Sequence, residues 1–95
     1  MSDATLFLAL DTAREAGERG LSSVAVGDTV EVVALRLEAD LAGWLRAVGI
    51  CEGDRVTVLR RAVFGGPIHV RMSSGGEFAL HRALAASVIT RVSFT

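Results

Sequence analysis

Short runs of alternating apolar and polar residues, separated by glycine-containing turns, most constrain the fold of this chain. Such alternation places every second side chain on one face of a β-strand. The runs span residues 29–37, 55–63, 67–73, 77–81 and 88–94. Because a chain of 95 residues has room for one domain, we predict a mainly β domain of about five short strands.

The apolar positions within these runs predict the hydrophobic core. We expect the core to contain Val30, Val32, Val56, Val58, Ile68, Val70, Phe78, Leu80 and Val88. Val92 and Phe94 continue the apolar face of the last run, and the alternation breaks at Val33, which indicates a bulge or bend. Five short strands with tight turns favour a small barrel, because closure removes exposed sheet edges.

Two longer segments have helical periodicity. Residues 40–48 form a short helix inserted after the first strand, and residues 3–19 predict an N-terminal helix that ends near Gly20. The shorter helix has an apolar stripe made of Leu41, Leu45 and Val48. Residues 82–86 predict one further helical turn. We therefore expect an N-terminal helical extension over residues 1–20 and the barrel domain over residues 21–95.

Charge and hydropathy exclude several classes of protein. With 51% hydrophobic residues and a net charge of -1, the chain is too apolar for disorder and lacks the summed positive charge of a general nucleic-acid or anionic-membrane binder. The first half carries a net charge of -4 and the second half +3, which indicates one acidic and one basic side. No apolar run is long enough to span a bilayer. We expect a cytoplasmic protein with no direct membrane insertion and no nucleic-acid partner.

Metal ligands are few and scattered. Cys51, His69 and His81, together with Glu52 or Asp54, are the candidate metal ligands, since zinc and iron accept these side chains. No two of these side chains are separated by the number of residues typical of a metal-binding motif, and a single cysteine excludes a CxxC site. We predict surface histidines, a small half-buried thiol, no metal site and no cofactor.

Catalytic patterns are absent from the sequence. Its turn and helix-end nucleophiles are Ser22, Ser23, Ser73, Ser74 and Cys51, and none has a histidine nearby in sequence. The pair Gly65-Gly66 lacks the Gly-Lys-Ser/Thr of a phosphate loop and is better interpreted as a hairpin turn. We predict that the protein is not an enzyme.

Four segments, taken in order, resemble the FeoA domain family. These are a Leu-polar-polar opening with a Gly turn (residues 21–28), a helix with a Val-Gly-Ile-x-x-Gly exit (41–53), a hairpin with the sequence Arg-Arg-Ala-Val-Phe-Gly-Gly-Pro (56–70) and a closing strand, turn and strand (78–88). The hairpin is the most specific of them. Trp44 departs from the family, whose members usually carry an arginine there.

The resemblance implies a fold and a function. It implies an SH3-like small β-barrel in a cytoplasmic accessory protein of bacterial ferrous iron uptake, acting on the membrane transporter FeoB and its GTP-binding part. It also implies a relationship to the C-terminal barrel of iron-dependent repressors. No catalytic residues are carried over. Two alternatives remain open: a free-standing metal-linked regulatory barrel and a small RNA-binding barrel.

The best candidates for partner contact are exposed aromatic side chains beside arginines. We expect Trp44 on the helix and Phe64 in the hairpin turn to anchor one surface, with Arg46 and Arg61 around it as donors to carboxylates. The alternative is that Trp44 caps the core. The partner is a FeoB-type transporter or a second copy of the chain.

A basic strand face is the second candidate surface. It consists of Arg60, Arg71 and Arg82. These side chains either keep strand edges soluble or contact an acidic protein. RNA binding is less favoured because few aromatic residues are free to stack on bases, and a chain without tyrosine is poorly suited to binding proline-rich peptides.

Overall fold

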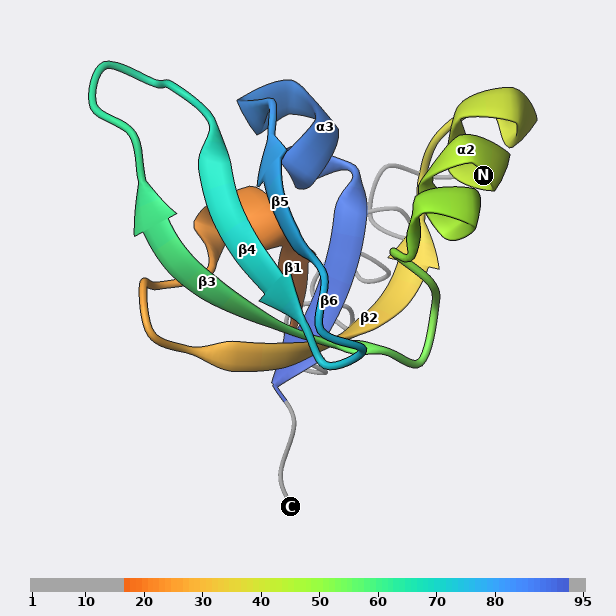
Figure 1. Cartoon of the computed structure of the whole chain (residues 1–95), viewed down its shortest axis with the longest axis horizontal. Helices are drawn as coiled ribbons and strands as arrows, with labels where there is room; N and C mark the ends of the chain where they lie inside the picture. The colour runs from red at the N-terminus through yellow and green to blue at the C-terminus, as the bar shows by residue number, and fades with distance from the viewer. Residues whose placement is uncertain (1–16, 93–95) are drawn as a thin grey trace, which may run out of the picture.

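The computed structural model describes residues 17–92, which form one curved antiparallel sheet with two short helices (Figure 1). The elements, in chain order, are β1 (Glu18–Gly20), η1 (Leu21–Ser23), β2 (Thr29–Leu35), α2 (Ala39–Val48), β3 (Arg55–Arg61), β4 (Ile68–Met72), β5 (Glu77–Leu80), α3 (Arg82–Ala86) and β6 (Val88–Val92). The strand order is β1-β6-β2-β3-β4-β5. No helix in this part of the chain is long and apolar enough to cross a membrane.

The sheet is not closed into a barrel, which corrects the sequence prediction. Its two edges are β1 and β5, and the helix α3 contacts both β1 and η1. The approach is so close that a Cβ atom at Gly20 would lie 2.6 Å from the carbonyl oxygen of Ala86. Because α3 occupies this position and β1 has only three residues, the edges do not pair within residues 17–92.

The N-terminal helix predicted over residues 3–19 is wrong at its end, where Glu18–Gly20 form β1. Residues 1–16 lie outside the described part of the chain. The strand forms because Glu18 and Arg19 pair with Arg91 and Thr90 of β6. The Thr90 hydroxyl, which is fully buried, also donates a hydrogen bond of 2.9 Å to the Arg19 carbonyl oxygen.

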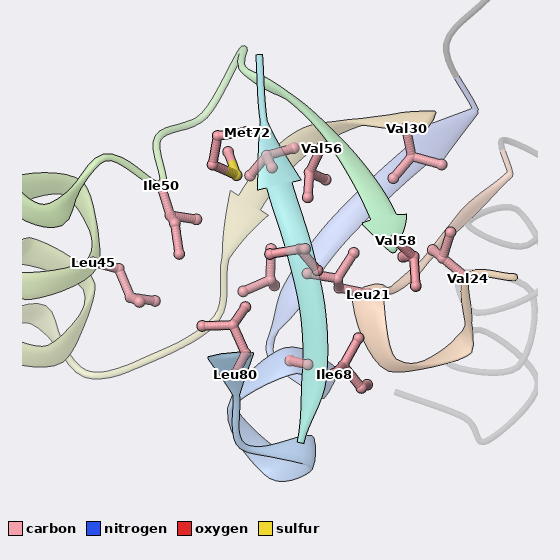
Figure 2. Close-up of a cluster of buried hydrophobic side chains, with 14 residues drawn as sticks. Leu21, Val24, Val30, Leu45, Ile50, Val56, Val58, Ile68, Met72 and Leu80 are labelled. Carbon is pink, nitrogen blue, oxygen red and sulfur yellow. The ribbon is translucent and has the colours of Figure 1, made fainter. Parts of the chain in front are cut away.

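The predicted core is confirmed. Eight of the nine expected residues are buried, and Phe78 packs half-buried against them. Figure 2 shows these side chains converging from the strands, with Leu21 and Val24 joining from the segment around η1 and Leu45 and Ile50 from the side of α2. Val92 is instead 42% exposed at the end of β6, and Phe94 lies outside the described residues.

Strand register explains the irregular alternation. The pairing of β2 with β6 shifts between Val32 and Ala34, so the bulge predicted at Val33 is confirmed. A second shift separates Val58 from Arg60 in β3. Bulges increase the twist and bend of a strand, which fits the strong curvature of the sheet.

Charged residues alternate across four neighbouring strands. Arg55 of β3 lies opposite Glu31 of β2, Glu31 lies opposite Arg91 of β6, and Arg91 lies opposite Glu18 of β1. The last pair forms an ion pair of 2.8 Å. Opposite charges on facing strands stabilise the pairing, and like charges destabilise it, so this row favours the observed register.

We predict that Val70→Ala lowers the free energy of unfolding by about 1–3 kcal/mol, because it removes buried methyl groups and leaves a cavity. Val70 is fully buried in β4. Urea denaturation measures the change. Val63→Ala is the matched control, since Val63 is 76% exposed, and equal effects of the two substitutions would contradict the core assignment.

Candidate functional site

The helix α2 is fixed to the domain through one side. Ala42 and Leu45 are buried, whereas Val48, expected in the apolar stripe, is exposed. The helix ends at Gly49 in the left-handed conformation (φ 114°), and the Ile50 N–H donates a hydrogen bond of 2.9 Å to the Leu45 carbonyl. This exit places Ile50 in the core.

The outer side of α2 is apolar and uncovered in the described structure. Trp44 is 55% exposed and Val48 37%. These two residues are four positions apart and so share one face of the helix. Gly43 and Ala47 are exposed beside them. We call these four residues the α2 face. It is a candidate binding surface, because an exposed tryptophan is typical of interface hot spots.

Arg46 is not free to surround this face, because it forms a two-point ion pair with Glu52. Its Nε and Nη2 atoms donate hydrogen bonds of 3.0 and 2.7 Å to the two carboxylate oxygens. The hydrogen bond from Arg46 lowers the pKa of Glu52 to about 2. The pair links the last turn of α2 to the turn that follows it.

Arg61 also has a structural role that the sequence did not predict. Its side chain crosses to the N-terminal segment, where Nη1 donates a hydrogen bond of 2.6 Å to the Ser22 carbonyl and Nη2 donates to the Val24 carbonyl. The Ser22 carbonyl lies within η1, and the Val24 carbonyl belongs to the residue that directly follows it. Arg61 therefore holds the η1 segment against β3.

The turn between β3 and β4 is the most exposed apolar segment. Phe64 at its centre is fully exposed. We call residues 62–67 the hairpin tip. In Figure 1 it projects from one side of the sheet and α2 lies on the other. Trp44 and Phe64 therefore do not form the single surface that the sequence suggested.

The three arginines of the predicted basic face are all exposed. Arg71 lies opposite Glu77 of β5, and Arg60 lies opposite His69 of β4. Arg82 begins α3 and approaches the hairpin tip: a Cβ at Gly65 would lie 3.4 Å from its Nη1 atom. Arg60 and Arg82 therefore belong with the hairpin tip, whereas Arg71 has an acidic neighbour.

The candidate metal ligands are dispersed. Among residues 17–92, no three His, Cys, Asp or Glu side chains lie close enough to hold one ion. The His81 Nδ1 atom accepts a hydrogen bond of 3.2 Å from the Ala83 N–H, which caps α3. The Cys51 thiol donates to the Arg46 carbonyl over 3.5 Å. The described part of the chain has no pocket for a substrate or cofactor.

One family model matches most of this chain. The family model described as FeoA domain matches residues 19–92. A search of curated proteins found no match.

Solved structures share the fold. An iron uptake regulatory protein (FeoA) is 28% identical over 78% of this chain and 94% of its own, with a TM-score of 0.66. A FeoA from Stenotrophomonas maltophilia complexed with zinc, described as a prokaryotic SH3 domain protein, is 23% identical over 75% of this chain and 87% of its own, with a TM-score of 0.64. The fold is thus SH3-like.

A longer protein contains a similar unit. A manganese-dependent transcriptional repressor, solved in complex with manganese, is 27% identical over 77% of this chain, with a TM-score of 0.69. The match covers 35% of the repressor, so the chain corresponds to about a third of that protein.

We predict that Arg61→Met lowers the free energy of unfolding by about 1–3 kcal/mol, because it leaves the part-buried Ser22 and Val24 carbonyls without their donor. Arg60→Met is the control, since Arg60 is exposed. Thermal and urea denaturation measure both variants. Equal stability of the two would mean that water replaces the Arg61 hydrogen bonds without cost.

We also predict that the pKa of Glu52, lowered to about 2 mainly by the hydrogen bond from Arg46 and further by a backbone hydrogen bond, rises in Arg46→Gln toward the ordinary glutamate value of 4.5. A carboxyl with a lowered folded-state pKa stabilises the fold above its unfolded pKa, and this contribution is lost as the pH falls toward the folded value. It should therefore disappear between about pH 4.5 and 2. Carboxyl-carbon NMR titration measures the midpoint, and the same midpoint in both proteins would contradict the ion pair.

Proposed function

Since this chain belongs to the FeoA domain family, we propose that it is a non-enzymatic accessory protein of ferrous iron transport that binds the cytoplasmic GTP-binding part of a FeoB-type transporter. The observation that carries this proposal is the family match over residues 19–92, nearly the whole of the described structure.

The α2 face supports the proposal as the contact surface. The helix is held to the domain by Leu45 and Ile50 and by its Schellman-type end, so its outer side is presented on a rigid element. Trp44 offers a large side chain with few rotatable bonds, which costs little entropy to immobilise. The Arg46–Glu52 ion pair, whose side chains are partly exposed, ties the last turn of the helix to the turn that follows it.

A free-standing, metal-linked regulatory domain is the second candidate. The structural likeness to a manganese-dependent repressor favours it. However, about two thirds of that repressor have no counterpart in this match, so the likeness concerns one domain. A stoichiometric manganese or iron site in the purified protein, detected by calorimetry, would favour this candidate over the transporter contact.

The RNA-binding alternative has less support. Binding to single strands uses several aromatic side chains on one platform. Here Phe78 packs against the core. The helix α2, which carries Trp44, and the hairpin tip, which carries Phe64, lie on different sides of the sheet (Figure 1). The described residues therefore offer no shared stacking surface.

We predict that the full chain binds the cytoplasmic part of a FeoB-type transporter from the same genome, and that Trp44→Ala weakens this binding about thirtyfold. Loss of a central interface anchor typically costs about 2 kcal/mol. Calorimetry measures the affinity and circular dichroism checks the fold. Phe64→Ser is the control, since it removes an even more exposed aromatic side chain, which belongs to the hairpin tip and not to the α2 face.

The possible results of this experiment test the proposed function and the proposed contact surface separately. No binding of the unaltered chain to the isolated domain or the whole transporter overturns the function. Binding that Trp44→Ala leaves unchanged rejects the α2 face alone. Unfolding of Trp44→Ala would mean that the tryptophan caps the core.

A further inference from the structure

The hairpin tip has a composition that the fold does not require. Its six residues, Ala62 to Pro67, include no polar side chain. Turns at the protein surface are typically rich in polar residues that bond to their own backbone. Val63 is 76% exposed and Phe64 fully exposed, so neither contributes to the core. The tip projects beyond the sheet (Figure 1).

The backbone conformation at position 64 also disfavours a phenylalanine. Phe64 and Gly65 have φ values of 58° and 72°, and the Gly66 N–H donates to the Val63 carbonyl over 3.2 Å. Two successive positive φ values are the pattern of a type I′ turn, which favours Asn or Gly at both centres. A bulky residue with positive φ is strained. Folding therefore disfavours phenylalanine here, which points to a role outside the fold.

Positive charge surrounds the tip. Arg60 precedes it on β3, and the Arg82 guanidinium lies beside Gly65. No aspartate or glutamate occurs between Asp54 and Glu77, so the whole β3–β4 hairpin is free of negative side chains. The acidic residues are concentrated in the first half of the chain.

We propose that the hairpin tip docks reversibly on an anionic lipid bilayer, with Phe64 and Val63 at the acyl boundary and Arg60 and Arg82 among the phosphate headgroups. Apolar side chains next to basic ones are the combination that binds such surfaces. A protein interface of standard size needs about 800 Å² of fitted surface on each partner. A bilayer accepts a narrow convex turn without a complementary pocket, which favours lipid over protein.

The backbone of the turn permits shallow insertion. The Ala62 N–H donates to the Pro67 carbonyl over 3.0 Å, and the Gly66 N–H is also bonded within the turn. Pro67 has no N–H to satisfy. Polar backbone groups without partners are costly in hydrocarbon, so a turn with internal bonds can reach the interface at lower cost.

This inference departs from the sequence prediction of no membrane insertion, and the reason is the distribution of charge. That prediction was based on the net charge of the whole chain, which is -1. The fold gathers Arg60 and Arg82 at one projecting tip, while Glu38 and Asp40 lie at the start of α2 on another side. A local cluster acts within about one Debye length, roughly 8–10 Å, and so can bind a surface that the total charge does not favour.

Sedimentation of the full chain with lipid vesicles tests the proposal. We expect binding to phosphatidylcholine vesicles that contain phosphatidylglycerol, and much weaker binding to pure phosphatidylcholine or at high salt. Phe64→Asn should reduce the partition coefficient about tenfold, because it removes most of the buried apolar area. Arg82→Gln should reduce it several-fold.

Two controls separate lipid contact from misfolding. Phe64→Asn should melt at or above the temperature of the unaltered protein, since Asn suits the type I′ turn better than Phe. Trp44→Gln should bind vesicles normally, because Trp44 lies on the α2 face. As Trp44 is the only tryptophan, the double variant Trp44→Gln/Phe64→Trp carries a reporter at the tip, and its emission should shift to the blue on anionic vesicles.

Three results would overturn the inference. They are no binding of the unaltered chain to anionic vesicles, binding that Phe64→Asn leaves unchanged, and equal binding to neutral and anionic vesicles. Weakened binding of Phe64→Asn to the transporter domain, without any vesicle binding, would assign the tip to a protein pocket instead. None of these results depends on the α2 face, so failure here leaves the proposed function standing.

Discussion

The position of β6 between β1 and β2 is the constraint on which the rest of the structure depends. Val88 and Thr90 of this strand are fully buried, and its two sides pair with strands from the start of the domain. In the observed strand order, β6 is the only strand that pairs with β1, and it is also the strand that follows α3 in the chain. The sheet therefore depends on contacts between residues some seventy positions apart, which form only when nearly the whole domain is present.

The same arrangement separates two exposed apolar features that are close in sequence. Only a short turn (residues 49–54) and β3 separate the α2 face from the hairpin tip in the chain, yet the strand carries the chain from one side of the sheet to the other (Figure 1). Arg46 and Arg61, which resemble free cations in the sequence, each bind groups of the protein itself. The surface charge available to partners is thus smaller, and more localised, than composition indicates.

Local pattern predicted the five longer strands, the bulge at Val33 and eight of the fourteen core residues found in the described structure, because period-two alternation depends on burial of one sheet face. Local pattern failed where the conformation of a segment depends on a partner that is distant in sequence. Glu18–Gly20 form a strand only through β6, and the closed barrel was wrong because α3 lies against β1. The role of Arg61 depends on carbonyls 37 and 39 residues away, which no spacing rule identifies.

The pairing of β1 with β6 has a consequence for how such domains are combined in longer proteins. Glu18 and Arg91, near the two ends of the described residues 17–92, lie opposite each other on adjacent strands. A unit whose first and last strands are neighbours can be appended to another domain, or inserted within a loop, without stretching the host chain. The manganese-dependent repressor, in which the matched unit makes up about a third of the protein, is an example of such modular use.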